Sequence, residues 1–434
     1  MIKPHSLACA TLRRRGIAGA VAVLATCALL PIEAQATPTY VYQQTLAIPG
    51  ATATHPFTGY DLATFDATTQ LYYLTDRSNN GIDVFSAATN QFVERIGSGL
   101  FAGTQGGNND IAGPNGISIS AVGSGRLLIA GNGPSNLITF TLDSTGLNVQ
   151  GAPRITSTAV AGTPTTPNRV DGVAYSPTAN SILAANNAST PGFVTLINNA
   201  TGAVIRSILL NGTNGYPDVG GNGVEATIFN TTRGTYFIAV PALNAAGNGA
   251  GGVIELNAAT GALLNVYDFN AMGLAGVCSP TGLVQGGGAS MLVACSDPAA
   301  GHSIVLNPAG SGSLTLVNGI SGGDQTAYNA ATNMYFEAAR FQIGGPVLGI
   351  IDAQTLALQI IAIGANDHSV AVDPISGEVF VATAATAAFA NCANGCIGVI
   401  APRAIPEPGS LALLAIAGVG LVLRRRPTRD GLRK

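Results

Sequence analysis

Lysine is almost missing from this 434-residue chain: Lys3 and Lys434 stand near its two ends, and residues 37–405 contain none. Charged residues make up only 9% of the sequence. Between 37 and 405 there are nine arginines and nineteen acidic residues, a net charge of −10 that the whole-chain value of −3 conceals. Such an acidic, lysine-free body argues against nucleic acid or an anionic membrane surface as a partner, and suits cations, neutral glycans or a basic protein surface.

The basic residues gather instead in the terminal segments. Residues 1–36 place Lys3 and Arg13–Arg15 before the apolar run GIAGAVAVLATCALL, and Ala34-Gln35-Ala36 follows. This order is typical of a secretory signal peptide, with cleavage by signal peptidase expected before Thr37. The low charge, the 56 glycines and the abundant Asn, Ser and Thr then indicate a β-rich secreted body.

A second apolar run, residues 409–423, lies near the C-terminus and precedes the cluster Arg424, Arg425 and Arg426. As a helix it spans roughly 22 Å, which is short of the ~30 Å hydrocarbon core of a membrane. With the arginines held inside the cell, it can still act as an anchor. One interpretation is a permanent tail anchor, and the other depends on the tripeptide Pro406-Glu407-Pro408 that comes just before the run.

Pro406, Glu407 and Pro408, a short apolar helix and an arginine cluster in this order resemble the PEP-CTERM sorting signal of Gram-negative bacteria. The resemblance implies that an exosortase cuts near the motif and that the helix anchors the protein only transiently in the inner membrane. The expected parts are a signal peptide (1–36), a globular domain (37–405), the sorting signal with its transmembrane helix (406–426) and a basic cytoplasmic tail (427–434). The mature protein is then expected at the cell surface or outside the cell.

Four cysteines remain after the expected processing, in a compartment that permits disulfides. Cys278 and Cys295 flank a segment that reads as a strand, a glycine turn and a strand, so a hairpin would set them nearly opposite each other. Cys392 and Cys396 enclose the short loop ANG. We expect these two pairs to form disulfides. A zinc site of Cys295 with His302 lacks the clustered ligand spacing of such sites.

A strand-like segment recurs seven times between residues 37 and 405. The copies are YDLATFD (60–66), NGISIS (115–120), VDGVAYSP (170–177), GVEATIFN (223–230), TGLVQ (281–285), DQTAYNA (324–330) and HSVAVDP (368–374). Each is followed by further short strands with Asn-Gly or Thr-Gly turns. Four antiparallel strands repeated seven times predict an all-β fold, a seven-bladed β-propeller.

The seventh unit stops after its third strand, and an extra strand, YVYQQTLAIPG (40–50), precedes the first unit. We expect this N-terminal strand to complete the last blade. At residues 71–97, LYYLTDRSNNGIDVFSAATNQFVERIG, the sequence resembles the YVTN family of propeller repeats, and more loosely the NHL and gluconolactonase-like groups. These groups mix binding proteins, surface proteins and a few metal-dependent hydrolases, so the resemblance supports the fold more than the function.

Aligning the seven segments brings one polar residue from each into a single column, at spacings of 54, 56, 54, 56, 43 and 44 residues. These column residues are Asp61, Asn115, Asp171, Glu225, Thr281, Asp324 and His368. Because they open the innermost strand of each blade, they should ring the central channel near its upper mouth.

Two interpretations of the column stay open. It is either a hydrated polar lining or a site for a ligand or for a hard cation such as Ca²⁺, which prefers oxygen ligands. The resemblance to gluconolactonase-like propellers implies a divalent ion, with Asp61, Asp171, Glu225 and Asp324 as candidate ligands. Without an ion, mutual repulsion should raise the pKa of one or more of these carboxyls.

Three other features of the sequence are candidate sites. Residues 76–81, DRSNNG, fit the start of a calcium loop, but Ala87 stands where a bidentate acid is required, and an Asn-Gly turn explains the same letters. Residues 319–323, GISGG, match G-x-S-x-G, yet no helical pattern follows as a nucleophile elbow requires. The connections 97–114 and 242–252 are long and glycine-rich, and should lie on the upper face of the propeller.

No catalytic residue is assigned. His55, His302 and His368 are the only histidines between 37 and 405, and no Ser/His/Asp, Walker or Rossmann arrangement appears. The sequence therefore favours an exported, non-catalytic binding or matrix module, associated with exopolysaccharide or biofilm, with a glycan, cation or protein ligand on its upper face. The alternative is a metal-dependent hydrolase of the lactonase type that uses the channel ring.

Overall fold

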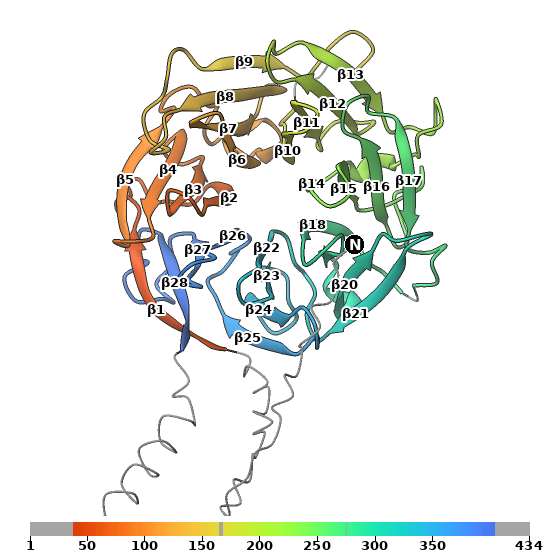
Figure 1. The fold of residues 1–434 in the computed structure, drawn as a ribbon. Coiled ribbons are helices and arrows are strands. Elements are labelled where there is room, and N and C mark those ends of the chain that lie inside the picture. The colour runs from red at the N-terminus through yellow and green to blue at the C-terminus, as the bar shows by residue number, and fades with distance from the viewer. Residues whose placement is uncertain (1–37, 165–167, 275, 404–434) are drawn as a thin grey trace, which may run out of the picture. The chain divides into compact units, whose positions relative to one another are not determined.

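The computed structural model describes residues 38–164, 168–274 and 276–403. The predicted signal peptide and the C-terminal sorting segment therefore lie outside the described residues. In the described part, the seven repeat units and one strand that precedes them form seven four-stranded antiparallel sheets, which stand around a central channel (Figure 1). The predicted all-β, seven-bladed propeller is confirmed.

The blades follow the chain in order, and each begins with its innermost strand. Blade 1 contains β2 (Tyr60–Asp66), β3 (Leu71–Asp76), β4 (Gly81–Ser86) and β5 (Gln91–Ile96). Blade 2 contains β6 (Ile117–Val122), β7 (Gly125–Asn132), β8 (Asn136–Leu142) and β9 (Arg154–Ser157). Blade 3 contains β10 (Val173–Ser176), β11 (Ser181–Asn186), β12 (Phe193–Asn198) and β13 (Val204–Leu209). Blade 4 contains β14 (Thr227–Asn230), β15 (Thr235–Val240), β16 (Gly252–Asn257) and β17 (Leu263–Asp268). Blade 5 contains β18 (Pro280–Gln285), β19 (Met291–Cys295), β20 (His302–Asn307) and β21 (Ser313–Asn318). Blade 6 contains β22 (Thr326–Asn329), β23 (Met334–Ala339), β24 (Val347–Asp352) and β25 (Leu358–Ala362). The helical elements of the described residues are three short 3₁₀ turns, η1 (Asn109–Ile111), η2 (Gly220–Asn222) and η3 (Pro298–Ala300).

Blade 7 combines strands from the two ends of the described chain. It contains β26 (Val370–Val372), β27 (Val379–Thr383), β28 (Cys396–Arg403) and, on the outside, β1 (Thr39–Ala47). β1 runs antiparallel to β28, with Thr39 opposite Arg403 and Ala47 opposite Cys396. The side chain of Gln359 in blade 6 accepts a hydrogen bond from the backbone N–H of Tyr40 and donates one to its carbonyl, so β1 is also tied to the neighbouring blade.

The core consists of one apolar layer between each pair of adjacent blades. Successive side chains of a strand point to opposite faces of its sheet, so each middle strand serves two layers. In β3, for example, Tyr72 and Leu74 pack toward blade 7, whereas Leu71 and Tyr73 pack toward blade 2. This is why the middle strands read as continuous apolar runs and not as alternating ones.

Glycines let the innermost strands converge at the upper end of the channel. Gly116 and Gly282 directly follow the column residues of their blades. A Cβ atom on Gly116 would lie 1.6 Å from the carbonyl oxygen of Asp171 in the next blade, and one on Gly282 would lie 1.9 Å from that of Asp324. Any larger residue at these positions would push neighbouring blades apart, so the column sits where the backbones of adjacent blades touch.

Both predicted disulfides are present. Cys278–Cys295 links the segment before β18 to the end of β19, and Cys392–Cys396 closes a short loop before β28. All four cysteines are fully buried. His302 lies at the start of β20 and pairs with Asn318 of β21 in the ladder of blade 5.

A buried carboxyl between blades 5 and 6 makes stability depend on pH. Glu337 in β23 is fully buried and accepts one hydrogen bond, from the Ser303 hydroxyl at 2.8 Å. Burial raises the pKa of Glu337 to about 8, although the Ser303 hydrogen bond opposes this.

Between about pH 4.5 and about 8, the folded protein therefore keeps a proton on Glu337 that the unfolded chain releases. This contribution to stability is complete below pH 4.5 and is lost as the pH rises toward 8, by about 1 kcal/mol per pH unit. Glu337→Gln should keep the hydrogen bond and remove this loss. Urea unfolding at several pH values should show the variant gaining on the wild type as the pH rises; parallel curves would contradict the assignment.

Candidate functional site at the mouth of the central channel

The central channel is a cavity of about 880 Å³, lined by the innermost strand of every blade. Six of the seven column residues lie in its wall: Asp61, Asp171, Glu225, Thr281, Asp324 and His368. The seventh, Asn115, is completely buried beside the cavity. Its side-chain amide donates to the carbonyls of Ala112 and Val170, and so it holds the loop before β6 in place.

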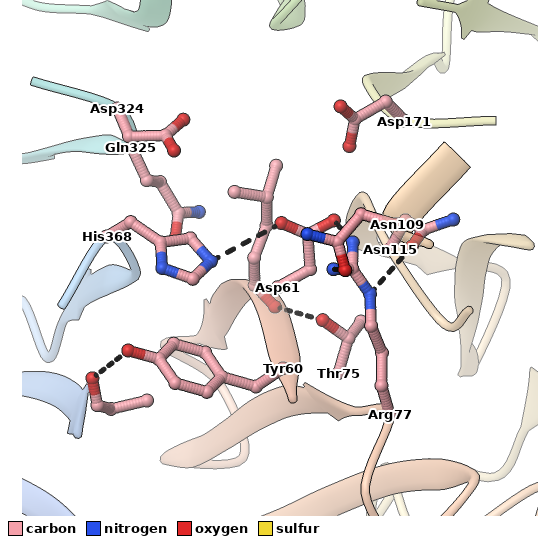
Figure 2. Close-up of polar contacts among 12 residues, drawn as sticks. Tyr60, Asp61, Thr75, Arg77, Asn109, Asn115, Asp171, Asp324, Gln325 and His368 are labelled. Atoms are coloured by element: carbon pink, nitrogen blue, oxygen red, sulfur yellow. Dashed lines mark hydrogen bonds and ion pairs between the residues drawn. The ribbon is translucent and has the colours of Figure 1, made fainter. Parts of the chain in front are cut away.

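In blade 1, the carboxylate of Asp61 forms a buried ion pair with Arg77, the residue that follows β3 (Figure 2). The Arg77 Nε atom also donates to the Oδ1 atom of Asn115 at 3.0 Å. Burial alone would raise the pKa of Asp61, but Arg77 and His368 outweigh it and hold this pKa below its usual value. Asp61 is therefore a permanently ionised carboxylate whose charge is already compensated.

The neighbouring histidine is fixed by its surroundings. The Nδ1 atom of His368 lies 2.7 Å from the carbonyl oxygen of Asn366, which can only accept, so Nδ1 carries a hydrogen. The Nε2 atom faces Asp61 Oδ1 at 3.6 Å. The ring stacks on Tyr60 with 4.6 Å between centroids, and the Tyr60 hydroxyl donates to the carbonyl of Ala382 at 2.8 Å. His368 thus joins blade 7 to blade 1 at the channel wall.

Blade 3 repeats the pairing of a carboxylate with an arginine. An Arg169 Nη2 atom lies 3.1 Å from Asp171 Oδ2, and the Arg169 Nε atom donates to Asn187 Oδ1 at 3.0 Å. The Asn187 amide in turn donates to Asp171. Burial raises the pKa of Asp171 to about 6; Asp61 and Asp324 add to this, while Arg169 opposes it.

Blades 5 and 6 contribute one hydroxyl and one further ion pair. The Thr281 hydroxyl donates to the carbonyl of Gly323 at 2.9 Å, which bridges the two blades. Asp324 pairs with Arg340 at 2.9 Å. In Figure 2, Asp171 and Asp324 lie on either side of the channel, with Asp61 between them.

Glu225 in blade 4 differs from the other carboxylates. Among the described residues, no arginine or histidine forms an ion pair with it. Burial raises the pKa of Glu225 well above its usual value, and the nearby charges of Asp171 and Asp324 raise it further, against the influence of Arg169 and Asn187. The pKa values of Asp171 and Glu225 are raised chiefly by burial, and the neighbouring carboxylates add to this.

The ring as a whole is a mixed-charge network and not a bare acidic cluster. Three of the four proposed metal ligands hold arginine partners, and within the described ranges no group of three or more His, Cys, Asp or Glu residues is placed to hold a metal ion. The arrangement therefore does not favour the divalent-cation interpretation.

Sequence reasoning missed the arginines, although a signal for them exists. Arg77 and Arg340 each follow their column aspartate, Asp61 and Asp324, by sixteen residues, the length of the innermost strand, a turn and the second strand. Asn187 follows Asp171 by the same interval. A second aligned column, sixteen positions after the first, would have revealed these partners.

Gln325 was also missed. It follows the column residue of blade 6, and its side chain accepts hydrogen bonds from the backbone N–H groups of Ala63 and Val370. It also donates to the carbonyl of Ala63. This one side chain thereby satisfies backbone hydrogen-bonding groups at the channel-facing edges of blades 7 and 1. In blade 7 the innermost strand, β26, is only three residues long.

Of the two long connections, only 97–114 has described residues in the cavity wall, namely Asn109 and Asp110. The backbone N–H of Arg169 donates to the Asp110 carbonyl at 2.6 Å, and Arg77 reaches Asn109 Oδ1 at 3.4 Å. The connection 242–252 instead contacts η2, through a hydrogen bond from Asn222 to the Gly247 carbonyl.

The other two sequence motifs are structural in the described part. Residues 76–81 form the turn between β3 and β4, in which Asp76 accepts from the backbone and side-chain amides of Asn79. Ser321 of the G-x-S-x-G match is buried, and its hydroxyl donates to the carbonyl of Pro298 at 3.0 Å. The strand β22 follows, not a helix.

The C-terminal segment decides how the chain is sorted. Residues 404–426 match the model of the PEP-CTERM protein-sorting motif. The chain carries a PEP-CTERM sorting motif. This motif makes the chain an exported protein that is processed by an exosortase. No helix of the described residues is long and apolar enough to cross a membrane, and the PEP-CTERM segment itself lies outside them.

Solved structures similar to this chain have low sequence identity to it, and they show the fold alone. A chain of a mitotic checkpoint complex covers 91% of this chain with all of its own length, at 11% identity and a TM-score of 0.57. The WD40 repeats of RRP9 give 10% identity and a TM-score of 0.57, covering 85% of this chain and 99% of theirs. A chain of hydrazine synthase from Kuenenia stuttgartiensis gives 13% identity and a TM-score of 0.56, covering 82% of this chain and 99% of its own length. No curated protein matches the sequence significantly.

Proposed function

We propose that this protein works outside the cell as a non-catalytic binding or matrix module, associated with exopolysaccharide or biofilm, and that the channel mouth is its ligand site. The observation that carries the proposal is the pairing of Asp61, Asp171 and Asp324 with arginines. Carboxylates held in this way are committed to fixed hydrogen bonds. They therefore form a rigid polar surface. They are not available as a general base or as ligands of a metal ion with an open coordination position.

The shape of the channel also supports binding. A cavity of about 880 Å³ lies within the range of small-molecule sites, and its polar groups converge at one mouth. Two of them, on Arg169 and Arg340, keep side-chain exposures of 18% and 28%, so a ligand can reach them.

The function itself is tested by screening the exported protein on a glycan array and by assaying it against lactones, phosphoesters and glycans. We expect saturable glycan binding and no turnover. Turnover of any of these substrates would replace the proposal with an enzymatic one.

A metal-dependent lactonase is the alternative, because four carboxyls do line one channel. The two are separated by melting the exported protein in chelator and in added Ca²⁺, Mg²⁺ and Zn²⁺. We expect the melting temperature to be unchanged. An ion at a hundredfold excess over its dissociation constant would add about 2.7 kcal/mol to the stability, and such a gain would favour the lactonase.

Processing gives a separate prediction. The intact mass of the protein at the cell surface or in the medium should correspond to a chain without residues 1–36 and without Arg424–Arg426. Surface protein that retains these arginines would instead indicate a permanent tail anchor.

A further inference from the structure

Nine asparagine residues of the propeller are directly followed by glycine, at positions between 80 and 395. Asparagine is a thermally labile residue, and a following glycine has no side chain that would hinder attack of its backbone nitrogen on the asparagine side chain. The attack requires a free side-chain amide, a free N–H on the glycine and a backbone that can bend. Hydrogen bonds and burial therefore decide which of the nine pairs can react.

Eight of the pairs are held by contacts that oppose this reaction. In four of them the asparagine side chain is already hydrogen-bonded, namely in Asn115, Asn132, Asn211 and Asn222. In two others the glycine N–H is bonded, at Gly319 and Gly395. Gly81 belongs to the β3–β4 ladder, and the backbone of Asn248 is bonded on both sides to the side chain of Asn244.

The ninth pair, Asn214-Gly215, lies exposed in the loop that follows β13. Among the described residues, no hydrogen bond reaches the Asn214 side chain or the Gly215 N–H. A Cβ atom at Gly215 would meet nothing within 4 Å, so the surroundings are open.

These two residues form the centre of a turn, which is closed by a hydrogen bond of 3.0 Å from the Tyr216 N–H to the Thr213 carbonyl. Both have a positive φ, +54° at Asn214 and +81° at Gly215, as in a type I′ turn. Only the outer residues of such a turn are bonded to each other, so the Gly215 nitrogen is left free beside the Asn214 side chain.

We propose that Asn214 is a site of spontaneous deamidation in the exported protein. The Gly215 N–H loses its proton to the solvent, its nitrogen bonds to the Asn214 Cγ atom, and the side-chain amide leaves as ammonia, which closes a succinimide ring. Water then opens the ring at either carbonyl and yields aspartate or isoaspartate. Each event replaces a neutral amide by a carboxylate, so the protein gains negative charge with age. This inference goes beyond the proposed binding function and does not depend on it.

The test follows all nine pairs by peptide mass mapping while the exported protein is incubated in mildly alkaline buffer, once folded and once in urea. In urea the nine pairs should gain mass at similar rates, because the contacts that distinguish them are lost. In the folded protein, Asn214 should react at least about tenfold faster than Asn115, whose amide must first break two hydrogen bonds. Isoaspartate, detected with an isoaspartate methyltransferase, should be among the products, since direct hydrolysis yields aspartate alone.

Asn211 is the matched control, because it lies three residues earlier in the same loop and its side chain accepts a hydrogen bond from the Thr213 N–H. Asn214→Gln should abolish the mass gain of this loop in the folded protein, whereas Asn211→Gln should leave it unchanged. An Asn214 that reacts in urea but stays intact in the folded protein would overturn the proposal. So would an Asn211 that reacts as fast as Asn214, or a product that contains no isoaspartate.

Discussion

Arg77→Ala is expected to lower the free energy of unfolding by about 3–5 kcal/mol, because it leaves the carboxylate of Asp61 buried without its partner. The side chains of Arg77 and Asp61 are only 5% and 11% exposed, so water shields the two charges little. The variant also loses the hydrogen bond from Arg77 to Asn115, which anchors the loop before β6. Urea unfolding followed by circular dichroism measures the change.

Two further variants separate the charge effect from simple truncation. Asp61→Asn combined with Arg77→Gln removes both charges and should recover most of the lost stability. Arg206→Ala is the control, since this arginine is exposed on β13 and lies over the ring of Tyr216; its loss should change the stability by about 1 kcal/mol or less. A loss for Arg77→Ala no larger than that of Arg206→Ala would contradict the buried ion pair.

Gly116→Ala should lower the free energy of unfolding of the propeller by about 3 kcal/mol or more, which is at the upper end of what an overpacked side chain costs. The added methyl group would meet the carbonyl oxygen of Asp171 at 1.6 Å, and backbone atoms of the next blade cannot rotate away as a side chain could. Blades 2 and 3 would have to separate, which disturbs the layer between them. The expected readouts are a lower melting temperature and faster proteolysis.

Gly221→Ala is the matched control, because an added Cβ atom at Gly221 meets nothing within 4 Å. Its stability should stay within about 0.5 kcal/mol of the wild type. Equal stability of the two alanine variants would show that neighbouring blades are not in backbone contact beside the column.

The repeat made the fold predictable from the sequence. Each unit reuses the same strand and turn pattern, so seven weak signals support one another, and the column placed Asp61, Asp171, Glu225 and Asp324 on the channel correctly. The partners of these residues were harder to predict, because they come from other segments. Arg77 follows the second strand of its blade, whereas Arg169 enters from the loop before the first. Only the register of the strands brings such residues together.

Asn115 shows the limit of column alignment. It occupies the same sequence position as the carboxylates, yet it is completely buried and bonded to Ala112 and Val170. A short amide satisfies the backbone of the adjoining loops, whereas a longer or charged side chain would turn toward water. The position in the repeat therefore predicts where the backbone of a residue lies, and the hydrogen-bonding capacity of its side chain decides whether that side chain faces the channel or the protein interior.

The pairing of β1 with β28 sets the order of events after export. The ladder joins residues 39–47 to residues 396–403, so the first and last described segments must be in the same compartment before blade 7 exists. A chain that is still crossing the membrane can form blades 1 to 6, each from one continuous segment, but it cannot complete blade 7. The sorting motif begins at residue 404, immediately after β28. The last strand of blade 7 therefore ends where the sorting motif begins, and no linker separates the closure of the propeller from the segment that directs its sorting.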